Sequence, residues 1–528
     1  MKSLDRAGNP SPWRPDQGNG HYRNPVLHAD YSDPDVVRVG DDFYMTASSF
    51  GHIPGLPILH SKDLVNWSLI NHAIVRMPLP GYDKPQHGKG VWAPSIRYHD
   101  GRYWIFYGDP DVGIMMTTAE DPAGEWSEIH LVQEGKGLID PCPFWDDDGS
   151  AYLVHAYAHS RSGIKHRLRV RRMSPDGMKL LHEGTVIIDD PARHPTIEGP
   201  KMYKRGKYYY VFAPAGGVEE GWQTVLRAEH PFGPYEDRIV LKQGNTPVNG
   251  PHQGAWVELA SGQSWFFHFQ HKDAYGRIVH LQPMEWTQED WPTMGTDIDG
   301  DGIGEPVQEA EKPDVGGHYP IAAPVASDGF DSDRLGLQWQ WQANPKPEWY
   351  SLTERTGYLR LFAQPNLEGS SSLYESPSLL LQKFPALSFR TTVRLDAAGL
   401  TGGNQAGLIL FGYHYAALVY SADPAGGAQL QLRRGDTERE EVVWQRRTNA
   451  EAVGLRAVVR DGALCDFYYR ADGEKFERVD QPSFQATVSK WVGAKVGLYA
   501  RTTENVARGY ADFDDFTVEE ATGNEEEG

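Results

Sequence analysis

The sequence predicts an all-β protein, a five-bladed β-propeller followed by a β-sandwich. A turn followed by an aromatic strand recurs five times before residue 295, and strands with different motifs resume near residue 328. The chain also contains 56 Gly and 37 Pro, which mark many turns rather than long helices. Because 528 residues are too many for one ordinary core, two domains are expected.

The repeated unit is a hairpin whose second strand is aromatic. The five copies are GDDFYMTASSF from Gly40, DGRYWIFYG from Asp100, DDGSAYLVHAY from Asp147, RGKYYYVFAP from Arg205 and SGQSWFFHFQ from Ser261. A short strand such as PDVVRV or APSIRY precedes each turn, and outer strands such as ILHSKDLVNWSLI follow. Four strands in roughly 50 to 60 residues are typical of a propeller blade. An antiparallel sandwich also repeats strands and turns, but it does not explain the similar residues before each hairpin.

The chain divides into five segments by composition. Residues 1–23 form an N-terminal extension, residues 24–295 the propeller, and residues 296–327 a linker rich in Gly, Pro and acidic residues. Residues 328–520 form the sandwich, where two-residue alternation, as in Leu359, Leu361 and Ala363, indicates antiparallel strands. Residues 521–528 are expected to be a disordered acidic tail.

Charge and composition restrict the partners. The net charge of −21 repels nucleic acid and anionic membranes, so a neutral or cationic partner suits the chain better, and a small oligosaccharide substrate is expected. No apolar run has the length of a signal peptide or a membrane span, which predicts a cytoplasmic protein. Cys142 and Cys465 lie in different domains and are expected to be free thiols. Assembly into a homo-oligomer stays open.

Three acidic residues stand before the inner strands of three different blades. Asp33 and Asp140 each precede a proline, and Glu198 precedes the pair Gly199 and Pro200. A single Asp-Pro is usually a turn, but three acids in one blade register predict side chains that converge at one end of the propeller axis. Since proline disfavours the α conformation at the residue before it, Asp33 is expected to be extended.

Converging carboxyls suit the hydrolysis of a glycosidic bond. An inverting hydrolase uses one carboxylate to activate water and one protonated carboxyl to protonate the leaving oxygen, about 6.5 to 9.5 Å apart. A nearby carboxylate raises the pKa of the acid and keeps it protonated near neutral pH. Asp140 is a candidate for that tuning role.

The propeller half resembles glycoside hydrolase family 43. Among the segments that carry the resemblance are YSDPDVVRVGDDFYMTASSF, GVWAPSIRYHDGRYWIFY, IDPCPFWDDDGSAYLVH and IEGPKMYKRGKYYYVFAPAGG, within residues 24 to 295. The resemblance implies that Asp33 is the general base, that Glu198 is the general acid, and that Asp140 orients the acid and modulates its pKa. It also implies that Arg277, in YGRIVHLQP, contacts the sugar. Family members commonly have His-Pro before the base, whereas Tyr31 and Ser32 precede Asp33 here.

Further positions join this site through the resemblance. Trp92 in VWAPS and Phe50 in ASSFGHIPG match sugar platforms, although core packing is the alternative for both. His252 in NGPHQGAW could bind a structural calcium ion on the axis, directly or through water, or be a hydrogen-bonded structural residue. The chemistry itself requires no cofactor.

An acidic run in the linker is a second candidate for a calcium site. Asp297, Asp299 and Asp301 in TDIDGDGIG alternate as in the start of a calcium loop. The later glutamate of an EF-hand is out of register, however, which favours a solvated acidic turn.

The C-terminal half resembles the concanavalin-like jelly roll appended to family 43 β-xylosidases, as FDSDRLGLQWQW and WYSLTERTGYLRL indicate. That resemblance implies a sandwich that closes one side of the pocket, with Tyr413 and Tyr415 as candidate wall residues; independent sugar binding is the competing role. The predicted function is inverting release of terminal xylose from β-1,4-xylooligosaccharides. The alternatives are an α-L-arabinofuranosidase, or a bifunctional enzyme, on arabinoxylan or arabinan side chains, and a non-catalytic carbohydrate-binding propeller.

Overall fold

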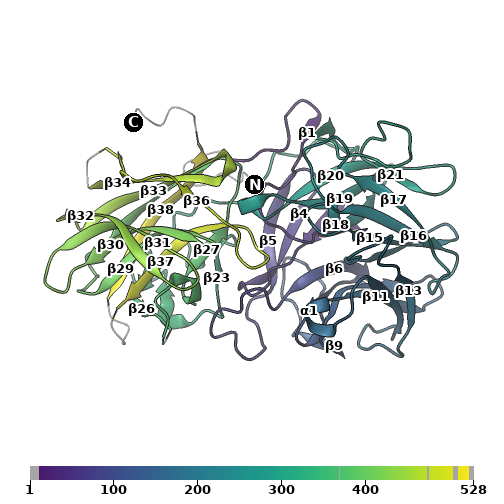
Figure 1. Ribbon diagram of the computed structural model, residues 1–528, viewed down its shortest axis with the longest axis horizontal. Coiled ribbons are helices and arrows are strands. Elements are labelled where there is room, and N and C mark those ends of the chain that lie inside the picture. The colour runs from purple at the N-terminus through teal and green to yellow at the C-terminus, as the bar shows by residue number, and fades with distance from the viewer. Residues whose placement is uncertain (1–10, 368, 472–474, 504–508, 522–528) are drawn as a thin grey trace.

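The computed structural model describes residues 11–367, 369–471, 475–503 and 509–521. Five four-stranded antiparallel sheets are followed by two eight-stranded sheets, which confirms the predicted all-β propeller and sandwich. The two parts lie side by side, with the sandwich on the left of the view and the propeller on the right (Figure 1). None of the helices in the described ranges is long and apolar enough to cross a membrane.

Each blade is a continuous stretch of chain whose four strands pair in sequence order. The first blade contains β2 (Asp35–Val39), β3 (Asp42–Thr46), β4 (Gly55–Ser61) and β5 (Trp67–Ile74). The second contains β6 (Trp92–His99), β7 (Arg102–Asp109), β8 (Gly113–Ala119) and β9 (His130–Glu134). The third contains β10 (Leu138–Trp145), β11 (Ala151–Tyr157), β12 (Arg167–Met173) and β13 (Thr185–Asp189), with helix α1 (His159–Ser162) between β11 and β12. The fourth contains β14 (Lys201–Arg205), β15 (Tyr208–Ala215), β16 (Trp222–Ala228) and β17 (Glu236–Lys242), and the fifth β18 (His252–Glu258), β19 (Ser264–His271), β20 (Arg277–Trp286) and β21 (Pro292–Met294).

The aromatic strands are buried on both faces because each blade lies between two others. On β19, Trp265 and Phe267 pack with residues of the first blade, whereas Phe266 packs with Tyr210 and Phe212 of the fourth. Successive side chains of a strand point to opposite faces, so one aromatic strand fills two inter-blade layers. The hydrophobic run that marks each repeat in the sequence therefore forms the propeller core.

Pairing at the chain ends of the propeller closes the ring. Inner strand β18 contacts β2, and Leu27 forms a β-bridge with Val279 of the fifth blade. Strand β1 (His21–Arg23) pairs with β22 (Glu309–Glu311). The segment after the last blade therefore folds back along the propeller beside the N-terminal segment.

The sandwich consists of two sheets around one large hydrophobic core, and their strands are antiparallel apart from one short parallel pair. The first sheet has the order β23 (Gln340–Trp341), β27 (Leu380–Lys383), β37 (Lys495–Thr502), β29 (Asn404–Phe411), β30 (Tyr415–Ala422), β31 (Ala428–Gly435) and β32 (Glu440–Thr448), with β26 (Gln364–Pro365) beside β37. The second has the order β24 (Tyr350–Ser351), β25 (Leu359–Phe362), β38 (Tyr510–Glu520), β28 (Phe389–Asp396), β33 (Ala452–Arg460), β34 (Leu464–Ala471) and β35 (Glu477–Arg478), with β36 (Phe484–Gln485) beside β34. Of the predicted acidic tail, residues 522–528 lie outside the described residues.

The sandwich docks on loops of the first and fifth blades through backbone hydrogen bonds. Ile53 and Trp341 exchange two such bonds, and the Ala494 N–H donates to the carbonyl of Ala274 at 2.7 Å. The Tyr275 hydroxyl donates to the carbonyl of Leu387 at 2.6 Å. These contacts bring a loop of the sandwich to the end of the propeller where the inner strands begin.

Candidate active site

The residue just before or within the start of every inner strand has a left-handed backbone. The five equivalent residues have φ between 35° and 58°, and they are Asp33, Ala93, Asp140, Gly199 and Gln253. The expectation of an extended Asp33 is therefore wrong, since its φ is 56°. In blades two, three and five this position lies in an irregularity of the inner hairpin, and such a bulge can hold a residue in the left-handed region despite the following proline. Bulges of this kind redirect side chains beside active sites.

The left-handed position shows that only two of the three acids share one register. Asp33 and Asp140 occupy it, but in the fourth blade it is held by Gly199, so Glu198 lies one residue earlier. The prediction of a single register is wrong for Glu198, which is instead equivalent to Trp92 and His252. Convergence is nevertheless observed, because the Gly199 N–H donates to Asp140 Oδ2 at 2.8 Å.

Asp33 is buried, and side-chain donors surround its carboxylate. Ser48 Oγ donates to Asp33 Oδ2 at 2.5 Å and Ser32 Oγ donates to the same oxygen at 2.8 Å. Arg277 Nη1 lies 3.2 Å from Oδ1. Ser48 Oγ also accepts the N–H of Ala93 at 2.7 Å, so one hydroxyl connects this carboxylate to the second blade. Sequence reasoning missed Ser48, which carries no motif of its own.

Arg277 is held from two sides at the start of β20. Its side chain donates to Ser32 Oγ at 2.7 Å, and its backbone N–H donates to Asp30 Oδ1 at 2.9 Å. The other oxygen of Asp30 accepts the N–H of Gly493 from the sandwich at 2.9 Å. Asp30, which the sequence did not single out, therefore connects the docked sandwich to the arginine beside Asp33.

Glu198 has very different surroundings. Burial raises the pKa of its carboxyl, and the negative charge of Asp140 raises that pKa further, although Arg277 opposes the shift. Among the residues that the structure describes, no hydrogen-bond donor to this carboxyl is found. The Glu198 side chain is 34 % exposed, so it is partly open to solvent.

Asp140 is buried next to this acid. Burial raises its pKa, the Gly199 N–H lowers it, and the charge of Asp33 raises it again. Because the Gly199 N–H follows Glu198 directly, Asp140 holds the backbone that carries Glu198 and also acts on its charge. The three carboxyls thus form one electrostatically linked group at the end of the axis.

Comparison with known proteins identifies this arrangement. Residues 22–292 match the family described as "Glycosyl hydrolases family 43". The chain belongs to glycoside hydrolase family 43. Residues 327–519 match the "Beta xylosidase C-terminal Concanavalin A-like domain". The family 43 protein is thus an enzyme, and the alternative of a non-catalytic carbohydrate-binding propeller is wrong.

Similar proteins cover nearly the whole family 43 chain. A protein of Xylanibacter ruminicola is 40 % identical over 492 residues, which cover 91 % of this chain and 86 % of the relative. A "Beta-xylosidase" of Formosa agariphila is 32 % identical, with 96 % and 91 % covered. The crystal structure of a xylan β-1,4-xylosidase from Bacillus halodurans C-125 superposes with a TM-score of 0.83 at 26 % identity, covering 94 % of this chain and all of the other.

His252 lies beside the acid in this family 43 site. Its Nε2 is 3.4 Å from Glu198 Oε1, and burial together with Arg277 lowers its pKa to about 3, so the ring is neutral. Within the described ranges, neither ring nitrogen has a hydrogen-bond partner. A fully buried neutral nitrogen without a partner fits one ligand of a hydrated cation. No other His, Cys, Asp or Glu in those ranges joins it in a group of three.

Aromatic rings form a wall at the start of the second blade. Trp92 begins β6 and is half-buried, and its ring lies 6.2 Å from Phe50 and 6.0 Å from Trp491 of the sandwich. Phe50 is 3 % exposed, which favours the packing reading for that residue. Trp491 is 43 % exposed with φ of 66°. The sandwich aromatic nearest this wall is therefore Trp491.

The two tyrosines considered from the sequence lie elsewhere. Tyr415 is fully buried and bonds to Glu440, and Tyr413 stacks on Tyr374 within the sandwich. Trp491 was missed because it lies in VSKWVGA, a segment with no motif, and only docking of the sandwich brings it beside Trp92.

The acidic run forms a turn after the fifth blade. Oxygens of Asp297, Asp299 and Asp301 lie within 4.8 Å of one another. Backbone N–H groups of the same turn donate to these carboxylates, and Lys242 Nζ donates to Asp301 Oδ2 at 3.0 Å. These bonds within the turn and the exposure of two of the three carboxylates favour the solvated acidic turn.

Proposed function

We propose that this enzyme is an inverting exo-β-xylosidase that releases terminal xylose from short β-1,4-xylooligosaccharides. The observation that supports it most directly is the contrast between two carboxyls of one pocket. Asp33 accepts hydrogen bonds from three side chains, whereas Glu198 accepts none from the described residues and has a raised pKa. Two carboxyls in such unequal surroundings suit a base and an acid.

Each residue then has one task. Glu198 donates its proton to the leaving glycosidic oxygen while the bond from that oxygen to the anomeric carbon breaks. Asp33 accepts a proton from the water that attacks the same carbon from the opposite face, so the anomeric configuration inverts. Asp140 holds the Gly199 N–H, and its negative charge keeps the proton on Glu198. Arg277 fixes Asp33 and offers further donors to sugar hydroxyls.

The docked sandwich supports exo action. Trp491 places a partly exposed ring beside Trp92, so the sandwich walls one side of the site. A walled pocket admits the end of a short oligosaccharide, while an open cleft would admit the interior of a polymer. Aromatic faces also suit the apolar faces of sugar rings.

An α-L-arabinofuranosidase, alone or combined with xylosidase activity, is the second candidate. A relative in Bacteroides ovatus that is 32 % identical over 414 residues, covering 74 % of this chain and 73 % of its own, is named a "Non-reducing end alpha-L-arabinofuranosidase". The β-xylosidase proposal is supported by the Formosa agariphila and Bacillus halodurans proteins, which align over more of this chain.

Turnover of two aryl glycosides separates these candidates. The wild type is expected to have a higher kcat/KM on aryl β-xyloside than on aryl α-L-arabinofuranoside, and Asp33→Ala and Glu198→Ala are expected to abolish both. NMR of xylobiose hydrolysis should first show α-xylose. Release of β-xylose would reject inversion, and a preference for the arabinofuranoside would select the second candidate.

We further propose that His252 binds a structural calcium ion on the axis, with water completing the coordination. The ion would supply positive charge that orders axial water. Because calcium is a hard cation that prefers oxygen ligands, water rather than further imidazole groups would complete its coordination. Thermal denaturation after EDTA treatment tests this proposal. Calcium should raise the Tm of the stripped wild type but not that of His252→Ala, and an equal effect on both would refute it.

A further inference from the structure

A second pocket lies between the second and third blades, at the end of the propeller that carries the three acids. Its volume is about 610 Å³, within the range of ~300–1,000 Å³ typical of small-molecule sites. Every residue that lines it lies between residues 79 and 161, a part of the chain that the structure describes without a gap. None of these residues belongs to the site described above.

Strand pairing places this pocket beside the acids. Gly108 of β7 is opposite Trp92 of β6, and a side-chain carbon at Gly108 would lie only 3.4 Å from the backbone nitrogen of Asp140. The next residue along β7, Asp109, lines the pocket. The pocket therefore begins one residue from the backbone contact between the second blade and Asp140.

Trp92 lies next to the pocket. It begins β6 at the blade position that Glu198 occupies in the fourth blade, and its ring is half-buried. The guanidinium group of Arg161, which lines the pocket, lies over this ring at 5.7 Å from its centre. A sugar ring bound beside Trp92 therefore has this pocket as its next neighbour on that side.

The docked sandwich limits the direction in which a bound chain can leave the acids. It stands against one side of the propeller, on loops of the first and fifth blades (Figure 1). The ring of His87 stacks on Tyr374 of the sandwich at 4.0 Å, whereas Lys89, two residues later, lines the pocket. The loop that enters the second blade thus separates the sandwich from the pocket. An oligosaccharide whose end reaches the acids runs out over the second to fourth blades, and the pocket lies on that route.

The lining combines apolar surface with donors and acceptors of hydrogen bonds. Leu79 and Val112 supply apolar surface, and Lys136 supplies an exposed ammonium group. One oxygen of Asp111 accepts the Nε–H of Arg161 at 3.1 Å, and the other has no hydrogen-bond partner among the described residues. Sites for small uncharged ligands commonly have this mixture of apolar walls and a few polar groups.

We propose that this pocket is a distal subsite that binds the third sugar of the substrate, counted from the xylose that is released. This inference rests on the proposed function, because it names the chain length that the same catalytic site prefers. The pocket holds carboxylates as well as amines, so the hydroxyl groups of a neutral sugar, which both donate and accept, fit it better than an anion. Xylobiose ends beside Trp92, whereas xylotriose extends into the pocket.

Kinetics on unmodified xylooligosaccharides tests the subsite. The kcat/KM for xylotriose is expected to exceed that for xylobiose about tenfold or more, because further binding in the transition state raises kcat/KM. Equal values on the two substrates, with xylose released from both, would overturn the subsite and leave the proposed function intact. Failure to cleave either substrate would overturn the proposed function and this inference with it.

Three variants place the effect in this pocket. Ser160→Trp fills it from helix α1, and Lys136→Met removes the ammonium group; in each, the ratio of kcat/KM for xylotriose to that for xylobiose should fall about fivefold or more. Ser261→Trp is the matched control, since this exposed serine lies on the turn between β18 and β19 at the other end of the blades, and its ratio should stay within about twofold of wild type. Both substrates are measured on the same protein, so a loss of folded enzyme does not change the ratio. An unchanged ratio in both pocket variants would overturn the proposal even if the wild type prefers xylotriose.

Discussion

Asp140→Asn is expected to move the alkaline limb of the pH profile to lower pH. Asparagine can still accept the Gly199 N–H, which Asp140 Oδ2 accepts at 2.8 Å, so the backbone beside Glu198 is retained while one negative charge is lost. The charge of Asp140 raises the pKa of Glu198. Without it, the ionised form of Glu198 is less disfavoured, its pKa falls, and the acid loses its proton at a lower pH.

The size of the shift follows from the geometry. The Gly199 N–H lies 2.8 Å from Asp140 Oδ2, so the Asp140 carboxylate contacts the residue that directly follows Glu198. At an effective dielectric constant of ~20, two neighbouring unit charges roughly 4 to 8 Å apart interact by about 2 to 4 kcal/mol. Because the Glu198 side chain is 34 % exposed, solvent screening reduces this by about half, which corresponds to about one pH unit.

The assay is the pH dependence of kcat/KM on an aryl β-xyloside with a poor leaving group, so that protonation by Glu198 limits the rate. Asp148→Asn is the control, since it makes the same charge change on the exposed turn of the same hairpin. The limb of Asp140→Asn should lie about one unit lower and that of the control within ~0.2 units of wild type. An unchanged or higher limb in Asp140→Asn would refute the role of Asp140 in holding the proton on Glu198.

Three further substitutions test other parts of the structure. Ser48→Ala removes a 2.5 Å hydrogen bond to Asp33. Because a hydrogen bond to a charged group contributes about 1.5–3 kcal/mol, kcat is expected to fall about tenfold or more. Ser49→Ala is the control, since Ser49 is a buried neighbour without that bond. Trp491→Ala removes the sandwich ring beside Trp92. Because an aromatic contact contributes about 0.5–1.5 kcal/mol, KM for xylobiose is expected to rise two- to tenfold. Asp35→Ala leaves Arg97 and Lys201 buried without their carboxylate and should lower the free energy of unfolding by about 3–5 kcal/mol in urea titrations.

For each of these substitutions, one outcome would contradict the prediction. Equal kcat losses in Ser48→Ala and Ser49→Ala would show that the loop, not the bond to Asp33, matters. An unchanged KM in Trp491→Ala would remove the sandwich from the substrate pocket. Unaltered unfolding of Asp35→Ala would mean that the buried pairs on the inner strands add no net stability.

The blades were predictable from the sequence because their signals are local. A turn and an aromatic strand of fixed period, such as DGRYWIFYG, specify a hairpin without reference to the rest of the chain. Strand β32 carried no such signal, because EEVVWQRRT alternates weakly and is mostly exposed. The three acids could be singled out for the same reason, since each stands beside a turn residue at the start of an inner strand.

Partners that come from distant segments could not be predicted. Ser48 and Asp30 have no motif, and they matter only because the first blade folds them against Asp33 and Arg277. The one-residue offset of Glu198 could not be predicted either. A left-handed residue interrupts the alternation of side chains along the strand, so the register of Glu198 follows only from the backbone geometry.

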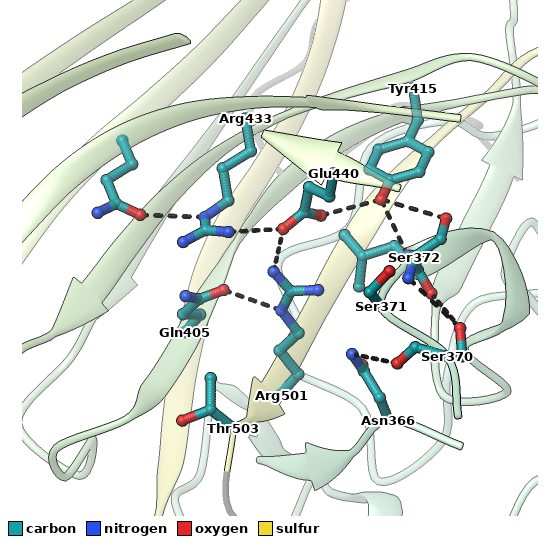
Figure 2. A network of polar contacts seen from close by, with 12 residues as sticks. Asn366, Ser370, Ser371, Ser372, Gln405, Tyr415, Arg433, Glu440, Arg501 and Thr503 are labelled. Atoms are coloured by element: carbon teal, nitrogen blue, oxygen red, sulfur yellow. Dashed lines mark hydrogen bonds and ion pairs between the residues drawn. The ribbon is translucent and has the colours of Figure 1, made fainter. Parts of the chain in front are cut away.

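The sequence by itself determined the two β folds and singled out three acids as candidates, because strand period, turn residues and carboxyl chemistry are properties of short segments. Only the tertiary structure decided how those acids differ. Hydrogen bonds across blades surround Asp33 with donors, while burial and a neighbouring charge act on Glu198. It also decided that Trp491 lies beside Trp92 and that Arg433 and Arg501 share one carboxylate, that of Glu440 (Figure 2), since both arrangements depend on segments far apart in the chain being packed together.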